Sequence, residues 1–273
     1  MRRVLDDHGL GRVASELSDM ARPCLRVESC DGEEQRSSRS KLGGLPSAPP
    51  GFAWPRGRNP MVFLGQFDLA EVALSGASAP LASAGLLLLF FDLAGVLTGP
   101  PAGHACIVPA DNLSTIHPPS GAVEVLRPRP VVLHPVLSLP DADPESPFLA
   151  TLELTPDEKG AYADMISLEE EIWGLRGSHQ LFGFPRGQAN DVHLACVYDT
   201  EEHPPWFEIR YQRPDASSVQ RVNAAARTWR LLAQFGEDER VGMRWLDDQP
   251  LAFMLPEARL ARGDLDATLV SVG

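Results

Sequence analysis

The sequence predicts one globular unit of the α+β class, predominantly β, with roll or barrel-like mixed or antiparallel sheets built from two duplicated halves and a few peripheral helices. Twenty-five prolines and 23 glycines lie throughout the 273 residues, and both residue types interrupt long helices and strands. From Met61 onward, short runs of branched and aromatic residues are bounded by Gly or Pro, as in consecutive strands. Three short segments also recur in the same order in the two halves of the chain.

The first elements are a helix and a strand. Val13, Leu17 and Met20 follow helical spacing and predict a helix that ends before Pro23. Leu25 and Val27 then alternate with polar residues, which indicates a half-buried strand. Residues 31–60 are rich in Gly and Pro, so we expect a long loop without regular structure.

The next region predicts strands at residues 61–64, 86–91, 105–108, 122–126 and 131–137, with a short helix at 69–74. Residues 141–147 are acidic and contain two prolines, which is typical of a linker. The expected organisation is an N-terminal helix, strand and arm (1–40), a first β-rich repeat (41–140), a linker (141–154) and a second β-rich repeat (155–273), all packed together.

The second half begins with the clearest helix signal. Thr155 as N-cap, Pro156 at the first position and Glu158 form a capping box, and we expect this helix to end at Gly174. A second helix is expected at residues 219–228. Strands are expected at 229–235, 241–245, 251–255 and 265–272, with a helical turn at 256–262.

The internal repeat rests on three matches. Residues 41–46 resemble 180–185, residues 63–67 resemble 231–235, and residues 88–90 align with 251–253. The second match places Gln66 and Gln234 in equivalent positions. A duplication explains the conserved order, and chance similarity is the alternative.

At these residues the sequence resembles the bacterial YwqG-like family, a domain of unknown function. The resemblance is carried by Leu-Gly-Gly-Leu-Pro (42–46), Phe-Leu-Gly-Gln-Phe (63–67), Leu-Phe-Gly-Phe-Pro (181–185) and Leu-Leu-Ala-Gln-Phe (231–235), and it spans about residues 40–272. It implies a β-rich, internally duplicated fold and no established activity. The acidic residues 237–239 and the pair Asp248-Gln249 depart from the family pattern.

Composition excludes several classes of function. With 24 basic and 37 acidic residues the formal net charge is −13, which argues against a broad nucleic-acid surface. The chain contains no apolar run long enough to span a membrane and no signal-peptide pattern, so we expect a cytoplasmic protein. The four cysteines and seven histidines show no metal-ligand spacing, and no nucleotide-binding or nucleophile motif occurs. We therefore expect no metal site and no cofactor.

The candidate binding residues are Arg186, Gln188, Asp191, Gln66, Gln234 and Trp54. Arg186 has the geometry to hold a carboxylate or phosphate, or to tie its turn to an acidic neighbour. The two repeat glutamines either face a shared cleft or bond to exposed backbone at strand ends. Trp54 either packs in the fold or anchors a partner. His179 and His193 flank the Arg186 turn, and either can serve as a general base beside Asp191 or lie at a strand end.

These observations favour a non-enzymatic binding module. Its expected site is a cleft between the two repeats, rimmed by the 41–60 loop and the 183–191 turn. The partner is expected to be a protein, which the module regulates or neutralises, or a small molecule, but not nucleic acid or a membrane. The alternative is a small-molecule enzyme, such as a hydrolase, that uses Arg186, Asp191 and a histidine in the same cleft.

Overall fold

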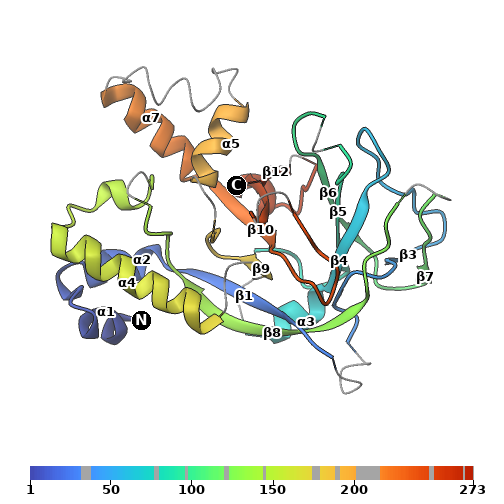
Figure 1. The fold of residues 1–273 in the computed structure, drawn as a ribbon, viewed down its shortest axis with the longest axis horizontal. Helices are drawn as coiled ribbons and strands as arrows, with labels where there is room; N and C mark the ends of the chain where they lie inside the picture. The colour runs from blue at the N-terminus through green and yellow to red at the C-terminus, as the bar shows by residue number, and fades with distance from the viewer. Residues whose placement is uncertain are drawn as a thin grey trace.

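The computed structural model shows one large antiparallel sheet with helices grouped at its periphery (Figure 1). It describes residues 1–31, 38–76, 80–95, 98–119, 123–143, 146–173, 179–187, 191–200, 216–245, 249–266 and 268–272. The strands of the sheet, in spatial order, are β12 (Leu269–Val272), β11 (Leu251–Pro256), β10 (Trp229–Phe235), β9 (His179–Phe182), β1 (Arg22–Ser29), β8 (Arg129–Ser138), β2 (Lys41–Leu42), β4 (Val62–Asp68), β5 (Leu86–Phe91) and β6 (Gly103–Val108).

The two edges of this sheet approach each other. Gly103 begins β6, and a Cβ atom at that position would lie 2.3 Å from the Val270 side chain of β12 and 2.7 Å from the Phe253 ring of β11. The sheet therefore curls into a nearly closed barrel whose interior is one apolar cluster drawn from both halves of the chain. The predicted fold class, a predominantly β fold with a barrel-like antiparallel sheet and a few helices, is confirmed.

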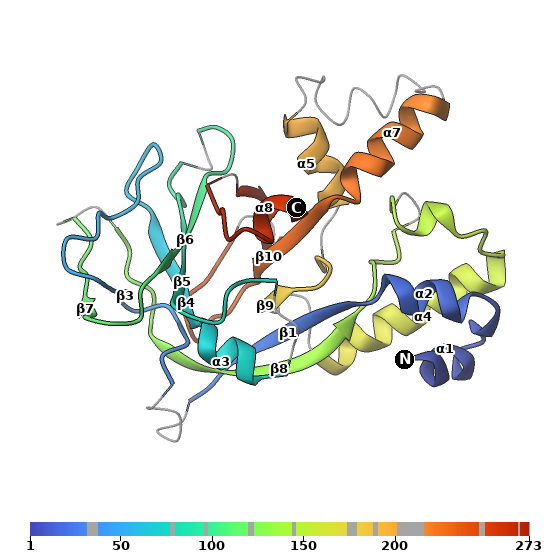
Figure 2. The same cartoon turned by 180° about the vertical axis from the view of Figure 1, so that it is seen from behind.

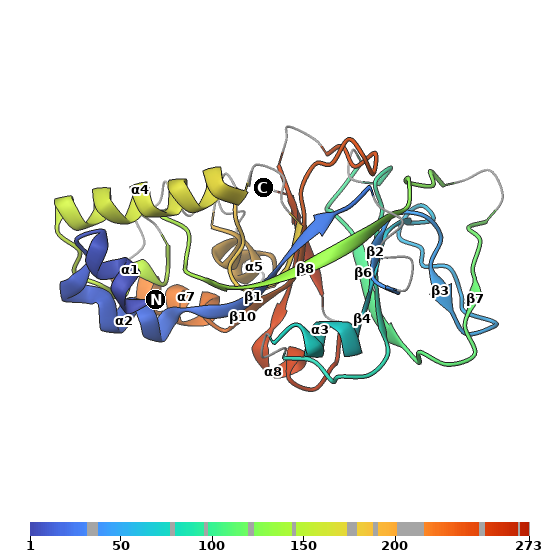
Figure 3. The ribbon, with the colours of Figure 1, turned by 90° about the horizontal axis from the view of Figure 1, so that it is seen from below.

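The strands β1 and β8 form the long central pair of the sheet. They run antiparallel from Arg22 opposite Ser138 to Ser29 opposite Val131. The helices of residues 2–20 and 149–173 lie at one end of this pair, and the barrel lies at the other end (Figure 3). These helices pack through a second apolar cluster and are α1 (Arg2–Asp7), η1 (Gly11–Val13), α2 (Ala14–Met20), η3 (Leu149–Thr151) and α4 (Pro156–Trp173).

The remaining helices cover other parts of the sheet. A third apolar cluster joins α5 and α7 to β10 and β11, and α8 lies beside the start of β10 (Figure 2). Within the described ranges, no helix has the length and apolar character needed to cross a membrane. These helices are α5 (Val192–Thr200), α7 (Ala216–Ala226) and α8 (Glu257–Leu260), and the short helix α3 (Leu69–Leu74) follows β4. The strands β3 (Ser47–Ala48) and β7 (Ser114–Thr115) form a separate two-stranded sheet.

Most predicted elements are present, and the capping box is confirmed. The Glu158 carboxylate accepts a hydrogen bond from the Thr155 N–H at 2.9 Å, and the Thr155 hydroxyl accepts one from the Glu158 N–H at 3.2 Å. The strand predicted at residues 251–255 is β11, and α3 has the predicted bounds. The predicted end of α4 at Gly174 lies outside the described residues.

Three predictions were wrong. Residues 31–60 contain the short strands β2 and β3. Residues 123–126 and 241–245 form no strand. The Leu126 carbonyl accepts a hydrogen bond from the Gly44 N–H, and the Gly242 and Met243 N–H groups donate to the Asp238 carbonyl in a local turn. Leu126 and Val241 are nevertheless buried in the barrel. The sequence analysis missed β9 and α5.

The two repeat glutamines lie in matched registers of the sheet. Gln66 pairs with Lys41 and Leu88, whereas Gln234 pairs with Gln180 and Ala252. Both strands carry a register shift one to three residues before the glutamine, between 63 and 65 in β4 and between 231 and 233 in β10. Leu88 lies opposite Gln66 and Ala252 lies opposite Gln234, so these two residues occupy matching positions, and the sequence alignment of Leu88 with residue 251 was displaced by one position.

Candidate functional site

The turn that follows β9 is held rigidly by buried amide side chains. The Gln234 side chain accepts a hydrogen bond from the Arg186 N–H at 2.9 Å and donates one to the Arg186 carbonyl at 3.1 Å. The Gln180 side chain donates to the Phe184 carbonyl at 2.6 Å. Gly183 has a positive φ of 76°, and a Cβ atom there would lie 2.7 Å from that of Cys24. The backbone of this turn is therefore fixed on both sides.

The Gln66 side chain makes one equivalent contact in the first half, with the Ser47 N–H, and one that differs, with the Arg39 carbonyl. It accepts a hydrogen bond from the Ser47 N–H at 2.9 Å and donates one to the Arg39 carbonyl at 2.7 Å. Both repeat glutamines thus bond to backbone, as the strand-capping interpretation expects, and neither amide faces a cleft shared by the two halves.

Arg186 is fully buried and points toward α4. Its guanidinium lies 3.4 Å from the Glu169 carboxylate, which also accepts a hydrogen bond from Arg26 at 2.9 Å. The Nε and Nη1 atoms of Arg186 have no hydrogen-bond partner among the described residues. This geometry fits the interpretation in which Arg186 ties its turn to an acidic neighbour.

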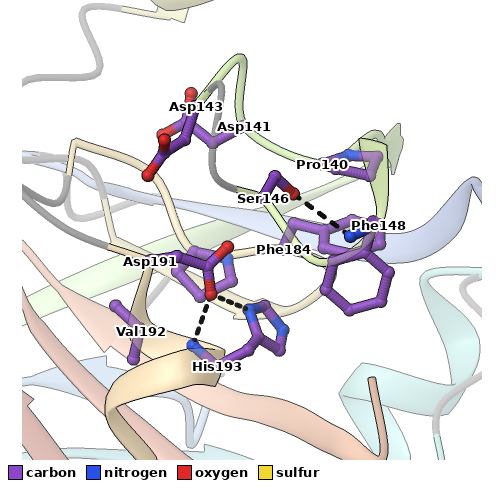
Figure 4. Close-up of a pocket in the computed structure, with 10 residues that line it drawn as sticks. Pro140, Asp141, Asp143, Ser146, Phe148, Phe184, Asp191, Val192 and His193 are labelled. Carbon is purple, nitrogen blue, oxygen red and sulfur yellow. Dashed lines mark hydrogen bonds and ion pairs between the residues drawn. The ribbon is translucent and has the colours of Figure 1, made fainter. Parts of the chain in front are cut away.

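Asp191 caps the helix α5. One carboxylate oxygen accepts hydrogen bonds from the backbone N–H groups of His193 and Leu194 and lies 3.5 Å from His193 Nδ1 (Figure 4). The His193 ring is buried and packs edge-on against Phe148, with ring centroids 4.8 Å apart. Burial lowers the pKa of His193, and the nearby Asp191 carboxylate opposes this shift. Both side chains line a cavity of about 30 Å³, which is room for one water molecule.

The other predicted site residues do not join this cluster. Trp54 donates its indole N–H to the Met61 carbonyl at 2.8 Å and packs edge-on against Phe90. His179 is buried against Phe235 and lies 3.6 Å from the Asp238 carboxylate, so its neighbours differ from those of His193. Gln188 lies outside the described residues. In the ranges that the structure describes, no three His, Cys, Asp or Glu side chains gather as a metal site.

A groove of about 900 Å³ lies on the other side of Phe148 and Phe184 from this small cavity. It shares the 182–184 turn with the predicted site, but none of the described residues in the 41–60 loop lines it. Its walls combine apolar and arginine side chains. They come from residues 19–23, 80–82, 148, 182–184, 227, 230–231, 257 and 260–263.

Arg22 is the most unusual residue of the groove. Its guanidinium lies over the Phe184 ring at 3.9 Å and near the Phe148 ring at 4.8 Å. Burial, and to a smaller extent the positive charge of Arg230, lowers the pKa of Arg22 to about 9. Its Nη1 atom is buried without a hydrogen-bond partner among the described residues. The groove thus presents a cation that has lost part of its hydration without gaining an ion pair.

Comparison with known proteins places most of this architecture in one family. A family model described as a domain of unknown function (DUF1963) matches residues 40–272. The chain belongs to this family. A search of curated proteins finds no match.

The DUF1963 match begins just before β2, so α1, α2 and β1 precede it. Arg22 therefore lies in the preceding segment, whereas Phe184, Arg230 and Leu260 belong to the DUF1963 domain. The groove is formed where these two parts of the chain meet.

Sequence reasoning missed Arg22 and Phe148 because no local pattern marks them. Arg22 stands before a strand as an ordinary polar flanking residue, and Phe148 follows an acidic, proline-containing stretch. The one available signal was the sign of the charge, since a basic residue at an element boundary is less expected in a chain of net charge −13.

Proposed function

We propose that the protein is a non-enzymatic binding module that holds an extended segment of a partner protein in the groove beside the 182–184 turn. The observation that carries this proposal is the groove itself, which combines a volume of about 900 Å³ with apolar walls and a preformed aromatic pair. Binding sites of this kind are concave, largely apolar and supplied with a few polar groups. The hydrogen bond that Gln180 donates to Phe184 and the one that Gln234 accepts from the Arg186 N–H hold this turn in place before any partner binds.

A small-molecule enzyme, such as a hydrolase, is the second candidate, because Asp191 and His193 line a cavity together. Its volume of about 30 Å³ admits water but no substrate, and the Asp191 carboxylate already caps α5. We expect no turnover of ester, amide or phosphate substrates. A measured activity that is lost in His193→Gln and kept in His134→Gln would favour the enzyme.

We also infer that the two halves arose by duplication of one unit. The matched registers around Gln66 and Gln234 support this inference, and so do the hydrogen bonds that their side chains accept from the N–H groups of Ser47 and Arg186. We further propose that the family relationship is to the YwqG-like proteins.

We also propose that the protein is cytoplasmic. Its four cysteines are all free thiols, which supports a reducing compartment.

Display selection tests the binding function directly. A library of random heptapeptides is selected against the wild-type protein, and the recovered peptides are measured on two variants. Ala261→Trp places an indole on the groove wall from an exposed helix end, and Ala224→Trp places one at an exposed position of α7 that does not line the groove. We expect peptides that bind wild type and Ala224→Trp equally and lose at least 10-fold in affinity on Ala261→Trp. Peptides that bind all three proteins equally would refute the proposed site.

A further inference from the structure

We infer that the groove recognises a carboxylate group of its occupant and that Arg22 is the residue that binds it. This inference rests on the proposed function of the groove and names the chemistry of the ligand. Three observations support it: the unbalanced charge of Arg22, the overall charge of the groove, and the fixed orientation of the guanidinium.

The first observation is that Arg22, among the described residues, has no compensating partner, unlike Arg227 and Arg230. The fourth groove arginine, Arg262, is exposed to solvent. Arg230 lies 2.7 Å from the Glu257 carboxylate, and Arg227 donates to the Pro147 carbonyl at 3.4 Å. Among the residues that the structure describes, no carboxylate lies within 4.0 Å of the Arg22 guanidinium. A partly buried cation without a counter-ion destabilises the protein. An anion that binds in the groove balances this charge, and its binding is therefore favourable.

The second observation concerns the charge of the surroundings. The groove is lined by four arginines and two acidic side chains, Asp19 and Glu257, which gives a local charge of +2. The whole chain carries −13. Because the rest of the surface repels anions and the groove attracts them, an anionic ligand is directed to this site.

The third observation is that two aromatic rings hold the guanidinium in place. Contact with the rings of Phe148 and Phe184 restricts the Arg22 side chain, and its Nη1 atom is buried, so the edge formed by Nε and Nη2 is the one left for hydrogen bonds with a ligand. A planar carboxylate matches such an edge and carries one negative charge, which balances one unpaired guanidinium. The apolar side chains of Leu81, Phe182 and Leu260 suit the hydrophobic group to which that carboxylate is attached.

Calorimetric titration with a matched pair of small probes tests the inference. The probes are 4-phenylbutyrate and its uncharged amide, 4-phenylbutanamide, and the proteins are wild type, Arg22→Gln and the control Arg244→Gln, whose side chain is exposed and outside the groove. We expect wild type and the control to bind the acid roughly 10- to 100-fold more tightly than the amide, since hydrogen bonds to charged groups differ from neutral ones by about this much. Arg22→Gln should bind the acid as weakly as the amide and leave amide affinity unchanged.

Equal binding of acid and amide by wild type would overturn the inference, as would an unchanged acid affinity in Arg22→Gln. A tighter complex with benzyl phosphate than with the acid would also overturn it, because the site would then select phosphate.

Two heptapeptides identify the source of the carboxylate: one has a free C-terminus after Phe, and the other has an amidated C-terminus and an internal Glu. Preference for either over an amidated Gln peptide supports the inference.

The outcomes separate this inference from the proposed function. If selected peptides lose affinity on Ala261→Trp but not on Arg22→Gln, the groove binds its partner without carboxylate recognition. If Ala261→Trp has no effect on any ligand, the groove is not the binding site and the proposed function fails.

Discussion

Removing the Gln234 amide gives the most informative test of how the groove wall is maintained. In Gln234→Leu the side chain keeps a similar size, but the N–H and carbonyl of Arg186 lose their partners at 2.9 and 3.1 Å. Both bonds are buried, and each unsatisfied backbone group costs roughly 1–3 kcal/mol. Since the leucine recovers part of this through apolar contacts, we expect a net loss of about 2–4 kcal/mol in the free energy of unfolding.

Urea denaturation followed by tryptophan fluorescence measures the loss, and hydrogen exchange locates it. The Arg186 amide should exchange much faster in Gln234→Leu, while the Ser47 amide, which is bonded to Gln66, keeps its protection. Gln66→Leu should give the converse pattern. Gln220→Leu, at an exposed position of α7, is the control and should stay within about 0.5 kcal/mol of wild type. An unchanged stability together with unchanged exchange at Arg186 would show that the amide does not hold the turn.

Gly183→Ala should destabilise the protein by about 2 kcal/mol or more in urea denaturation, because the new methyl group would lie 2.7 Å from Cys24 Cβ at a positive φ of 76°; a smaller effect than that of Gly160→Ala would contradict this. The hydrogen bond from Arg12 lowers the pKa of Glu158 from 4.5 to about 2, so its stabilisation is complete above pH 4.5 and is lost as the pH falls toward 2. The stability difference between wild type and Glu158→Gln should therefore shrink over that interval, and a difference constant with pH would count against the ion pair. Arg22→Met should leave the ligand-free protein as stable as wild type or more so by thermal denaturation, and a clear decrease would mean that Arg22 has a compensating partner.

Local signals in the sequence predicted much of the fold. The capping box at Thr155 and Glu158 predicted the start of α4. Gly85 and Gly236 marked the start of β5 and the end of β10, and such signals depend only on residues close together in the chain. The segments at 123–126 and 241–245 have the composition of strands. They form none because the Leu126 carbonyl bonds to the distant turn at Gly44, while the N–H groups of residues 242 and 243 bond to Asp238 in a local turn. Composition encodes neither arrangement.

The site was less predictable than the fold. The turn that carries Arg186 was recognised as important, but its arginine points into the protein toward Glu169 rather than toward a ligand. Arg22, Phe148 and Phe184 meet only because β1, the segment before η3 and the turn after β9 are brought together by the sheet. Contacts between such distant positions depend on the whole topology, so no motif indicated this part of the groove.

The location of a bound partner segment tests the central claim most directly. A selected heptapeptide with one photoreactive benzophenone residue is crosslinked to the wild-type protein, and the modified residues are identified by mass spectrometry. We predict crosslinks at Phe184, Leu260 and Ala261, which line the groove. Crosslinks confined to Trp54 and the 41–60 loop would place the binding surface elsewhere and contradict the account.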